Sequence, residues 1–112
     1  MVYNANQGDI VLLDFNPQAG HEQAGRRPAL VVSNMKYQKY TNGLVIVCPI
    51  TNTLTPFPLH LPLDIRTKTT GVIMCEQVKA LDMKARNIGF IECLPQDLLQ
   101  EVLDRIILSL DT

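Results

Sequence analysis

The sequence contains no tryptophan and only three cysteines, Cys48, Cys75 and Cys93. Three cysteines cannot all pair within one chain, and each lies in or beside an apolar run. We therefore expect buried, reduced thiols in a cytoplasmic protein. Spaced clusters of cysteine or histidine are also missing, so neither a metal site nor a cofactor is predicted. The apolar runs are too interrupted to span a membrane, and the N-terminus has no basic, apolar export signal. These absences predict no membrane partner.

The chain is nevertheless rich in apolar residues, which make up 46% of it and are too many for a disordered chain. A length of 112 residues predicts a single domain, residues 1–112, with a modest but sufficient core. The net charge of −1 is unlike that of most nucleic-acid binders. Binding to a nucleic acid would require the basic residues to gather on one face, whereas composition alone favours charges that merely solvate the surface.

Short apolar runs predict a mainly β protein. The expected strands cover residues 8–15, 28–33, 44–50, 57–63, 71–80 and 89–93. Prolines at positions 58 and 62 make the fourth of these an edge or irregular strand. Between the second and third strands, Asn34 is a suitable cap for a short helix within residues 34–42.

The C-terminal segment has a different period. Apolar residues recur there at helical spacing: Leu98, Leu99, Val102, Leu103, Ile106, Ile107 and Leu110. Pro95 suits the first helical position and Asp97 the first turn. The stripe predicts contact with the core or with a second copy of the chain. Strands with little helix between them then predict a small twisted barrel closed or covered by one helix.

The densest group of polar side chains lies between the first two expected strands. Residues 20–28 read G-H-E-Q-A-G-R-R-P. A loop held by two strands is a common place for chemistry, and histidine, glutamate and arginine can supply a proton acceptor, a proton donor and a fixed positive charge. The same residues would also suit a solvated turn bounded by glycines. From the residues alone, both interpretations stay open.

Further motifs follow in order. The segment G-D-I at 8–10 and N-P at 16–17 precede the loop, and P-I-T at 49–51, T-G-V-I-M-C-E-Q at 70–77 and L-D-M-K-A-R at 81–86 follow it. Together they resemble the MazF/PemK/Kid family of bacterial toxins from type II toxin–antitoxin pairs, over about residues 8–110. The resemblance implies the SH3-like barrel that these toxins share with the gyrase poison CcdB. It also implies a metal-independent endoribonuclease that cleaves single-stranded mRNA to 2′,3′-cyclic phosphate and 5′-hydroxyl ends, which inhibits translation and growth.

The same resemblance implies four catalytic residues. Arg27 matches the family's phosphate-binding arginine, and a guanidinium can hold two phosphate oxygens at once. Thr51 matches the threonine that touches the scissile phosphate, to which a hydroxyl can donate. His21 matches a histidine with an acid–base role in the Kid branch. Glu22 matches a glutamate used in catalysis or in orienting the arginine. A solvated histidine and a structural partner for Arg27 are the alternatives for the last two.

One departure from the Kid branch affects the mechanism. That branch has a catalytic arginine at the position of Met74 and an aspartate at the position of Glu76. The complete catalytic mechanism of the Kid branch therefore cannot be carried over to this sequence, and Glu76 becomes a candidate general base. Reading of unstacked bases is expected from the loops 16–19, 52–57 and 66–69. The residues expected to contact RNA are Gln23, Asn52, Thr53, Phe57, Thr70 and Glu76.

The resemblance also implies partners, namely a second copy of the chain and a cognate antitoxin whose flexible acidic tail covers the active groove. The apolar C-terminal stripe suits a two-fold interface. Two other functions are considered. A CcdB-like gyrase poison would bind a topoisomerase and cut nothing, and a barrel-type interaction module would have lost catalysis. The polar loop favours the ribonuclease, because poisoning of gyrase needs no such cluster.

Overall fold

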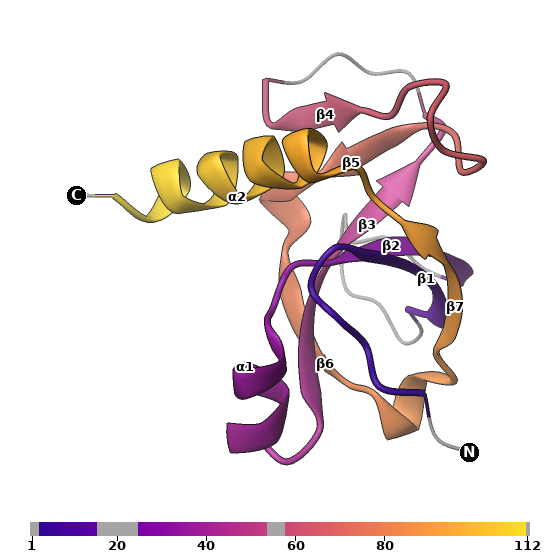
Figure 1. Cartoon of the computed structure of the whole chain (residues 1–112), viewed down its shortest axis with the longest axis vertical. Coiled ribbons are helices and arrows are strands. Elements are labelled where there is room, and N and C mark those ends of the chain that lie inside the picture. Colours follow the sequence, from indigo (N-terminus) through magenta and orange to yellow (C-terminus); the bar gives the residue numbers. More distant parts are fainter. Residues whose placement is uncertain (1–2, 16–24, 54–57, 112) are drawn as a thin grey trace.

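An antiparallel sheet organises the structure, a computed structural model that describes residues 3–15, 25–53 and 58–111 (Figure 1). Within these ranges the hydrogen-bonded order is β4-β5-β3-β2-β1-β7, and β6 also pairs with β3. The strands are β1 (Asp9–Asp14), β2 (Arg26–Val31), β3 (Leu44–Thr51), β4 (His60–Pro62), β5 (Val72–Met74), β6 (Lys79–Asp82) and β7 (Gly89–Cys93). The mainly β prediction is confirmed, and β4 lies at the edge of the sheet, as the prolines at positions 58 and 62 predict.

Two α-helices and two 3₁₀ turns, η1 (Cys75–Gln77) and η2 (Lys84–Arg86), complete these ranges. Helix α1 (Met35–Tyr40) has the predicted cap, because the Tyr37 N–H donates to Asn34 Oδ1 at 3.0 Å. Helix α2 (Gln96–Leu110) has Asp97 in its first turn as predicted. Pro95 is its N-cap and not its first helical residue, one position from the prediction. No helix of the described ranges is both long and apolar enough to cross a membrane.

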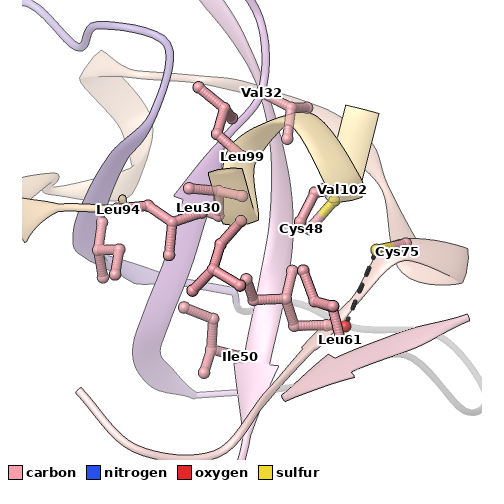
Figure 2. Close-up of a cluster of buried hydrophobic side chains, with 12 residues drawn as sticks. Leu30, Val32, Cys48, Ile50, Leu61, Cys75, Leu94, Leu99 and Val102 are labelled. Atoms are coloured by element: carbon pink, nitrogen blue, oxygen red, sulfur yellow. Dashed lines mark hydrogen bonds between the residues drawn. The ribbon is translucent and has the colours of Figure 1, made fainter. Parts of the chain in front are cut away.

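The sheet carries a buried cluster on each face, because successive side chains of a strand point to opposite sides. Helix α2 covers one cluster, and Figure 2 shows Leu99 and Val102 of this helix with Leu30 and Cys48 of the sheet. The cluster on the other face consists of Ala5, Val11, Leu13, Phe15, Ala29, Val31, Val45, Val47 and Leu81. The Lys79 ammonium of β6 lies 5.4 Å from the centre of the Phe15 ring, just beyond β1. The sheet therefore curls around the second cluster.

The segment 71–80 is not the single strand that its apolar residues predict. It forms β5, then η1, then β6. Both strands pair with β3, with Ile50 opposite Ile73 and Val47 opposite Lys79. Between these two pairs β3 moves by three residues, whereas the segment opposite it moves by six. The excess is the three residues of η1. Pro49 lies on β3 between the two registers and has no N–H to offer a continuous ladder.

The prediction for the cysteines is right for two of the three. All three thiols are free, and Cys48 and Cys75 are buried. Cys93 is exposed, because it is the last residue of β7, which forms the other edge of the sheet. Its Sγ lies 3.8 Å from Asp9 Oδ1, and local desolvation of the thiol together with the Asp9 carboxylate raises its pKa.

The loop between β4 and β5 is tied to other elements by its charged side chains. The Arg66 guanidinium donates to both oxygens of Asp64 and to both oxygens of Asp97 in α2, at 2.8–3.1 Å. These contacts lower the pKa of both carboxyl groups. Arg66 was expected to help read RNA bases, but its donors are engaged within the chain. An arginine held between two carboxylates is poorly suited to bind another anion.

Glu92 of β7 anchors the same loop and leads to a stability prediction. Its carboxylate accepts the Thr69 N–H at 2.8 Å, the Thr69 hydroxyl at 2.7 Å and the Lys68 N–H at 3.1 Å. Desolvation opposes ionisation, but these hydrogen bonds outweigh it and lower the pKa of Glu92. A lowered folded-state pKa contributes stability above the unfolded pKa, and this contribution is lost as the pH falls through the folded value. We expect Glu92→Gln to lower the free energy of unfolding by about 1 kcal/mol at pH 7, the site being partly solvated.

Urea denaturation of the wild type and of Glu92→Gln at pH 7 and at about pH 3 checks this prediction. The difference between the two proteins should shrink at the acidic pH, because the contribution of the Glu92 carboxylate is lost as the glutamate becomes protonated. An equal difference at both pH values would show that the carboxylate charge does not anchor the loop.

Candidate active site

Arg27 and Thr51 lie on neighbouring strands of the sheet. Ala29 of β2 is directly opposite Pro49 of β3, and continuing this antiparallel register by two residues places Arg27 across from Thr51. Residues opposite each other, and residues two apart in a strand, share a face of the sheet. The two residues that the sequence singles out therefore share one face near the end of β3. Arg27 is half-buried and Thr51 is buried.

Polar groups gather around Thr51 where β3 ends. The Thr53 N–H donates to Thr51 Oγ1 at 3.2 Å, and the two hydroxyl oxygens are also 3.2 Å apart. The Thr70 hydroxyl donates to Asn52 Oδ1 at 3.0 Å. Thus Asn52, Thr53 and Thr70, all expected to contact RNA, are brought together with Thr51. The motifs P-I-T and T-G-V, far apart in the sequence, meet because Thr51 pairs with Val72.

Gly71 allows this close approach. Its φ is +115°, a conformation that residues with a side chain rarely adopt. A Cβ atom at this position would lie 2.3 Å from the Thr51 carbonyl oxygen and 3.0 Å from Asn52 Oδ1. The glycine of the T-G-V motif is therefore required for the packing of the cluster around Thr51.

A second polar pair lies on the same side of the sheet. Glu76 projects from η1, and its Oε2 is 2.9 Å from Nε2 of His60 in β4. The side chains of His60 and Glu76 are only 12% and 23% exposed. His60 is directly opposite Met74, which is two residues along β5 from Val72, the partner of Thr51. His60 and Thr51 therefore share a face, in rows about 7 Å apart along the strands.

His60 was not singled out from the sequence. It lies in the run P-L-H-L-P, where a lone histidine between leucines gives no sign of its partner. Its pairing with Glu76 depends on the register of β4 with β5 and on the 3₁₀ turn η1, neither of which is a local property of the sequence.

The two consecutive arginines have different environments. Arg26 is exposed, and its Nη1 donates to the Asn87 carbonyl oxygen at 2.9 Å, which ties the start of β2 to the turn after η2. Arg27 is on the opposite face of β2, since adjacent residues of a strand alternate. The other expected site residues, His21, Glu22, Gln23 and Phe57, lie outside the described residues.

The chemistry of this face follows from its groups. A guanidinium next to a hydroxyl can bind phosphate oxygens, and a carboxylate paired with an imidazole can accept or hold a proton. In residues 3–15, 25–53 and 58–111 no group of three or more His, Cys, Asp or Glu side chains could hold a metal ion. The fold and this face together define a small antiparallel β protein with an arginine, hydroxyl groups and a His–Glu pair on one face near its strand ends.

Comparison with known proteins gives the family. Residues 6–110 match the family of PemK-like, MazF-like toxins of type II toxin–antitoxin systems, and the chain belongs to this family. It is 38% identical over 104 residues to endoribonuclease PemK of Escherichia coli, a match covering 89% of this chain and 77% of PemK. It is 36% identical over 84 residues to the endoribonuclease toxin MazF of E. coli K12, covering 75% of this chain and 74% of MazF.

Solved structures agree with this assignment. MazF of Deinococcus radiodurans superimposes with a TM-score of 0.90 at 37% identity, covering 97% of this chain and 98% of that one. A MazE–MazF crystal structure from the same organism gives a TM-score of 0.84 at 30% identity, with 99% of each chain covered. The predicted family and fold are thereby confirmed.

Proposed function

We propose that this toxin is a metal-independent endoribonuclease that cuts single-stranded mRNA at short sequence motifs and so inhibits translation and growth. The observation that carries the proposal is the position of Arg27 across from Thr51 on one face, in a chain whose curated relatives are endoribonucleases. This pair supplies a fixed positive charge and a neutral donor for one phosphate.

In the proposed reaction the 2′-oxygen of the RNA attacks the adjacent phosphorus, and the bond from phosphorus to the 5′-oxygen breaks. The Arg27 guanidinium binds the non-bridging oxygens and stabilises the negative charge of the phosphorane. The Thr51 hydroxyl donates to the same phosphate. A base removes the 2′-hydroxyl proton, and an acid protonates the departing 5′-oxygen. Glu76 and the His21–Glu22 pair are the groups proposed for these two proton transfers.

Substrate contacts are proposed for the residues around this pair. Asn52, Thr53 and Thr70 lie at the end of β3 beside Thr51, where they can contact the ribose or base next to the scissile phosphate. Gln23 and Phe57 are proposed to read or stack on neighbouring bases. The products are a 2′,3′-cyclic phosphate and a 5′-hydroxyl.

Two protein partners belong to the proposal. MazF of D. radiodurans was crystallised with MazE, and we propose that a cognate antitoxin neutralises this chain by covering the same face. We also propose a homodimer. The buried residues of α2 are Leu98, Leu99 and Val102, whereas Ile107, Leu108 and Leu110 are 63–75% exposed. The C-terminal half of α2 extends past the sheet in Figure 1. These exposed apolar side chains suit a contact with a second copy.

Cleavage of a long RNA in the presence of EDTA tests the function. We expect discrete cuts in unpaired regions, with cyclic phosphate and 5′-hydroxyl ends. Thr51→Val keeps the shape of the side chain but removes the hydroxyl, and it should lower the cleavage rate by about 10-fold or more. Mapping of the cut ends and a rate measurement for both proteins give the result.

Annealing the same RNA to a complementary strand serves as the control and should prevent cutting. A folded protein that cuts no RNA would contradict the proposal. Binding to gyrase would then be measured, because a CcdB-like poison predicts binding without cleavage. An inactive interaction module predicts neither.

A further inference from the structure

The contact between His60 and Glu76 has no place in the reaction as proposed so far. It joins the edge strand β4 to η1, the turn at which the pairing of β3 changes register. His60 Nε2 and Glu76 Oε2 are 2.9 Å apart, and both side chains are mostly buried. Because a carboxylate only accepts hydrogen bonds, Nε2 carries the proton and donates to Glu76.

We propose that His60 is a positioning residue for Glu76, holding its carboxylate on the face that carries Arg27 and Thr51 so that Glu76 accepts the 2′-hydroxyl proton. The inference rests on the proposed ribonuclease function and assigns to Glu76 the role of general base. It adds a residue of β4 to a site built from β2, β3 and the segment after β5.

The two nitrogens of His60 explain why it acts through Glu76. Nδ1 is buried within the protein, so RNA cannot reach it, and Nε2 is directed at Glu76. On Glu76, Oε2 takes this hydrogen bond, whereas Oε1 has no hydrogen-bond partner in the described part of the chain. A carboxylate held by one oxygen keeps the other in a fixed place for a proton.

The position of the pair suits a base for this reaction. His60 shares its face with Thr51, about 7 Å away along the strands and, with β5 between them, about 10 Å away across the sheet, a separation that long side chains and a nucleotide can together bridge. The short strand β4 is bounded by Pro58 and Pro62, whose fixed φ restricts the backbone on both sides of His60. The imidazole is thus presented from a stiff segment.

The test compares His60→Ala, His60→Gln and Glu76→Gln with the wild type, using cleavage of a defined single-stranded RNA. His60→Ala should lower kcat by about 10-fold with little change in KM, because Glu76 loses its orientation while the groups that bind the substrate stay in place. His60→Gln can still donate an N–H to Glu76 and should restore most of kcat. Glu76→Gln should lose at least as much activity as His60→Ala.

Two controls separate the inference from the proposed function and from unfolding. Thermal unfolding of each variant shows whether it is folded, and Gln77→Ala tests a change in η1 outside the pair. Full activity of His60→Ala or of Glu76→Gln would overturn the inference while leaving the ribonuclease in place. Equal losses in His60→Ala and His60→Gln would also overturn it, because they indicate a structural role. If the wild type cuts no RNA, both proposals fail.

Discussion

Replacing Arg27 by alanine is expected to lower the rate of RNA cleavage by about 10²–10³-fold while the protein stays folded. Arg27 is half-buried on the face shared with Thr51, so its guanidinium can meet the phosphate where negative charge develops. Arg27→Lys should recover only part of the loss, because an ammonium cannot hold two phosphate oxygens in a planar fork. Single-turnover cleavage of a defined RNA measures the chemical step directly.

Arg26→Ala is the matched control, since it removes the same side chain one position away and from the other face of β2. It should keep near-normal activity and lose only its contact with the Asn87 carbonyl. Loss of activity in Arg26→Ala with full activity in Arg27→Ala would place the phosphate on the opposite face and contradict the proposed site.

Gly71→Ala is expected to lower the free energy of unfolding by about 3 kcal/mol and to abolish most cleavage. The added Cβ would lie 2.3 Å from the Thr51 carbonyl oxygen at a φ of +115°, so strain and overpacking both contribute. To relieve the contact, the end of β3 must move away from Thr70, which breaks the hydrogen bond from Thr70 to Asn52. Urea denaturation and the cleavage assay measure the two effects.

Gly43→Ala provides the comparison for this change. Gly43 also has a positive φ, +109°, but no atom lies within 4 Å of the position of its Cβ. It should show only the cost of the backbone conformation, about 1 kcal/mol, and normal cleavage. Equal effects of the two substitutions would mean that the contact with Thr51 is unimportant.

Much of the fold could be predicted from local signals. The apolar stripe of α2, the Asn34 cap of α1 and the strand β7 lie where the sequence places them. These features depend on residues a few positions apart, whose periodicity and capping chemistry are visible in the chain. The resemblance of the motifs identified the family, and the structural comparison confirms it.

Other features could not be predicted, because they depend on how distant segments pair. The apolar run 71–80 has the pattern of one strand, yet it is interrupted at η1 where its register with β3 shifts by three residues. Cys93 has apolar neighbours like the other cysteines, but it lies at a sheet edge and is exposed. Arg66 was expected to face RNA, but two carboxylates from different segments hold it.

The features of the candidate site can likewise be divided into those that the sequence determines and those that depend on the tertiary structure. The sequence by itself determined which side chains are available, Arg27, Thr51 and Glu76 among them, because residue type fixes charge and hydrogen-bonding capacity. Only the tertiary structure decided which of them share a face and that His60 joins Glu76. A side chain's face and neighbours follow from strand register, and a shift of one residue would turn every side chain of a strand to the other side.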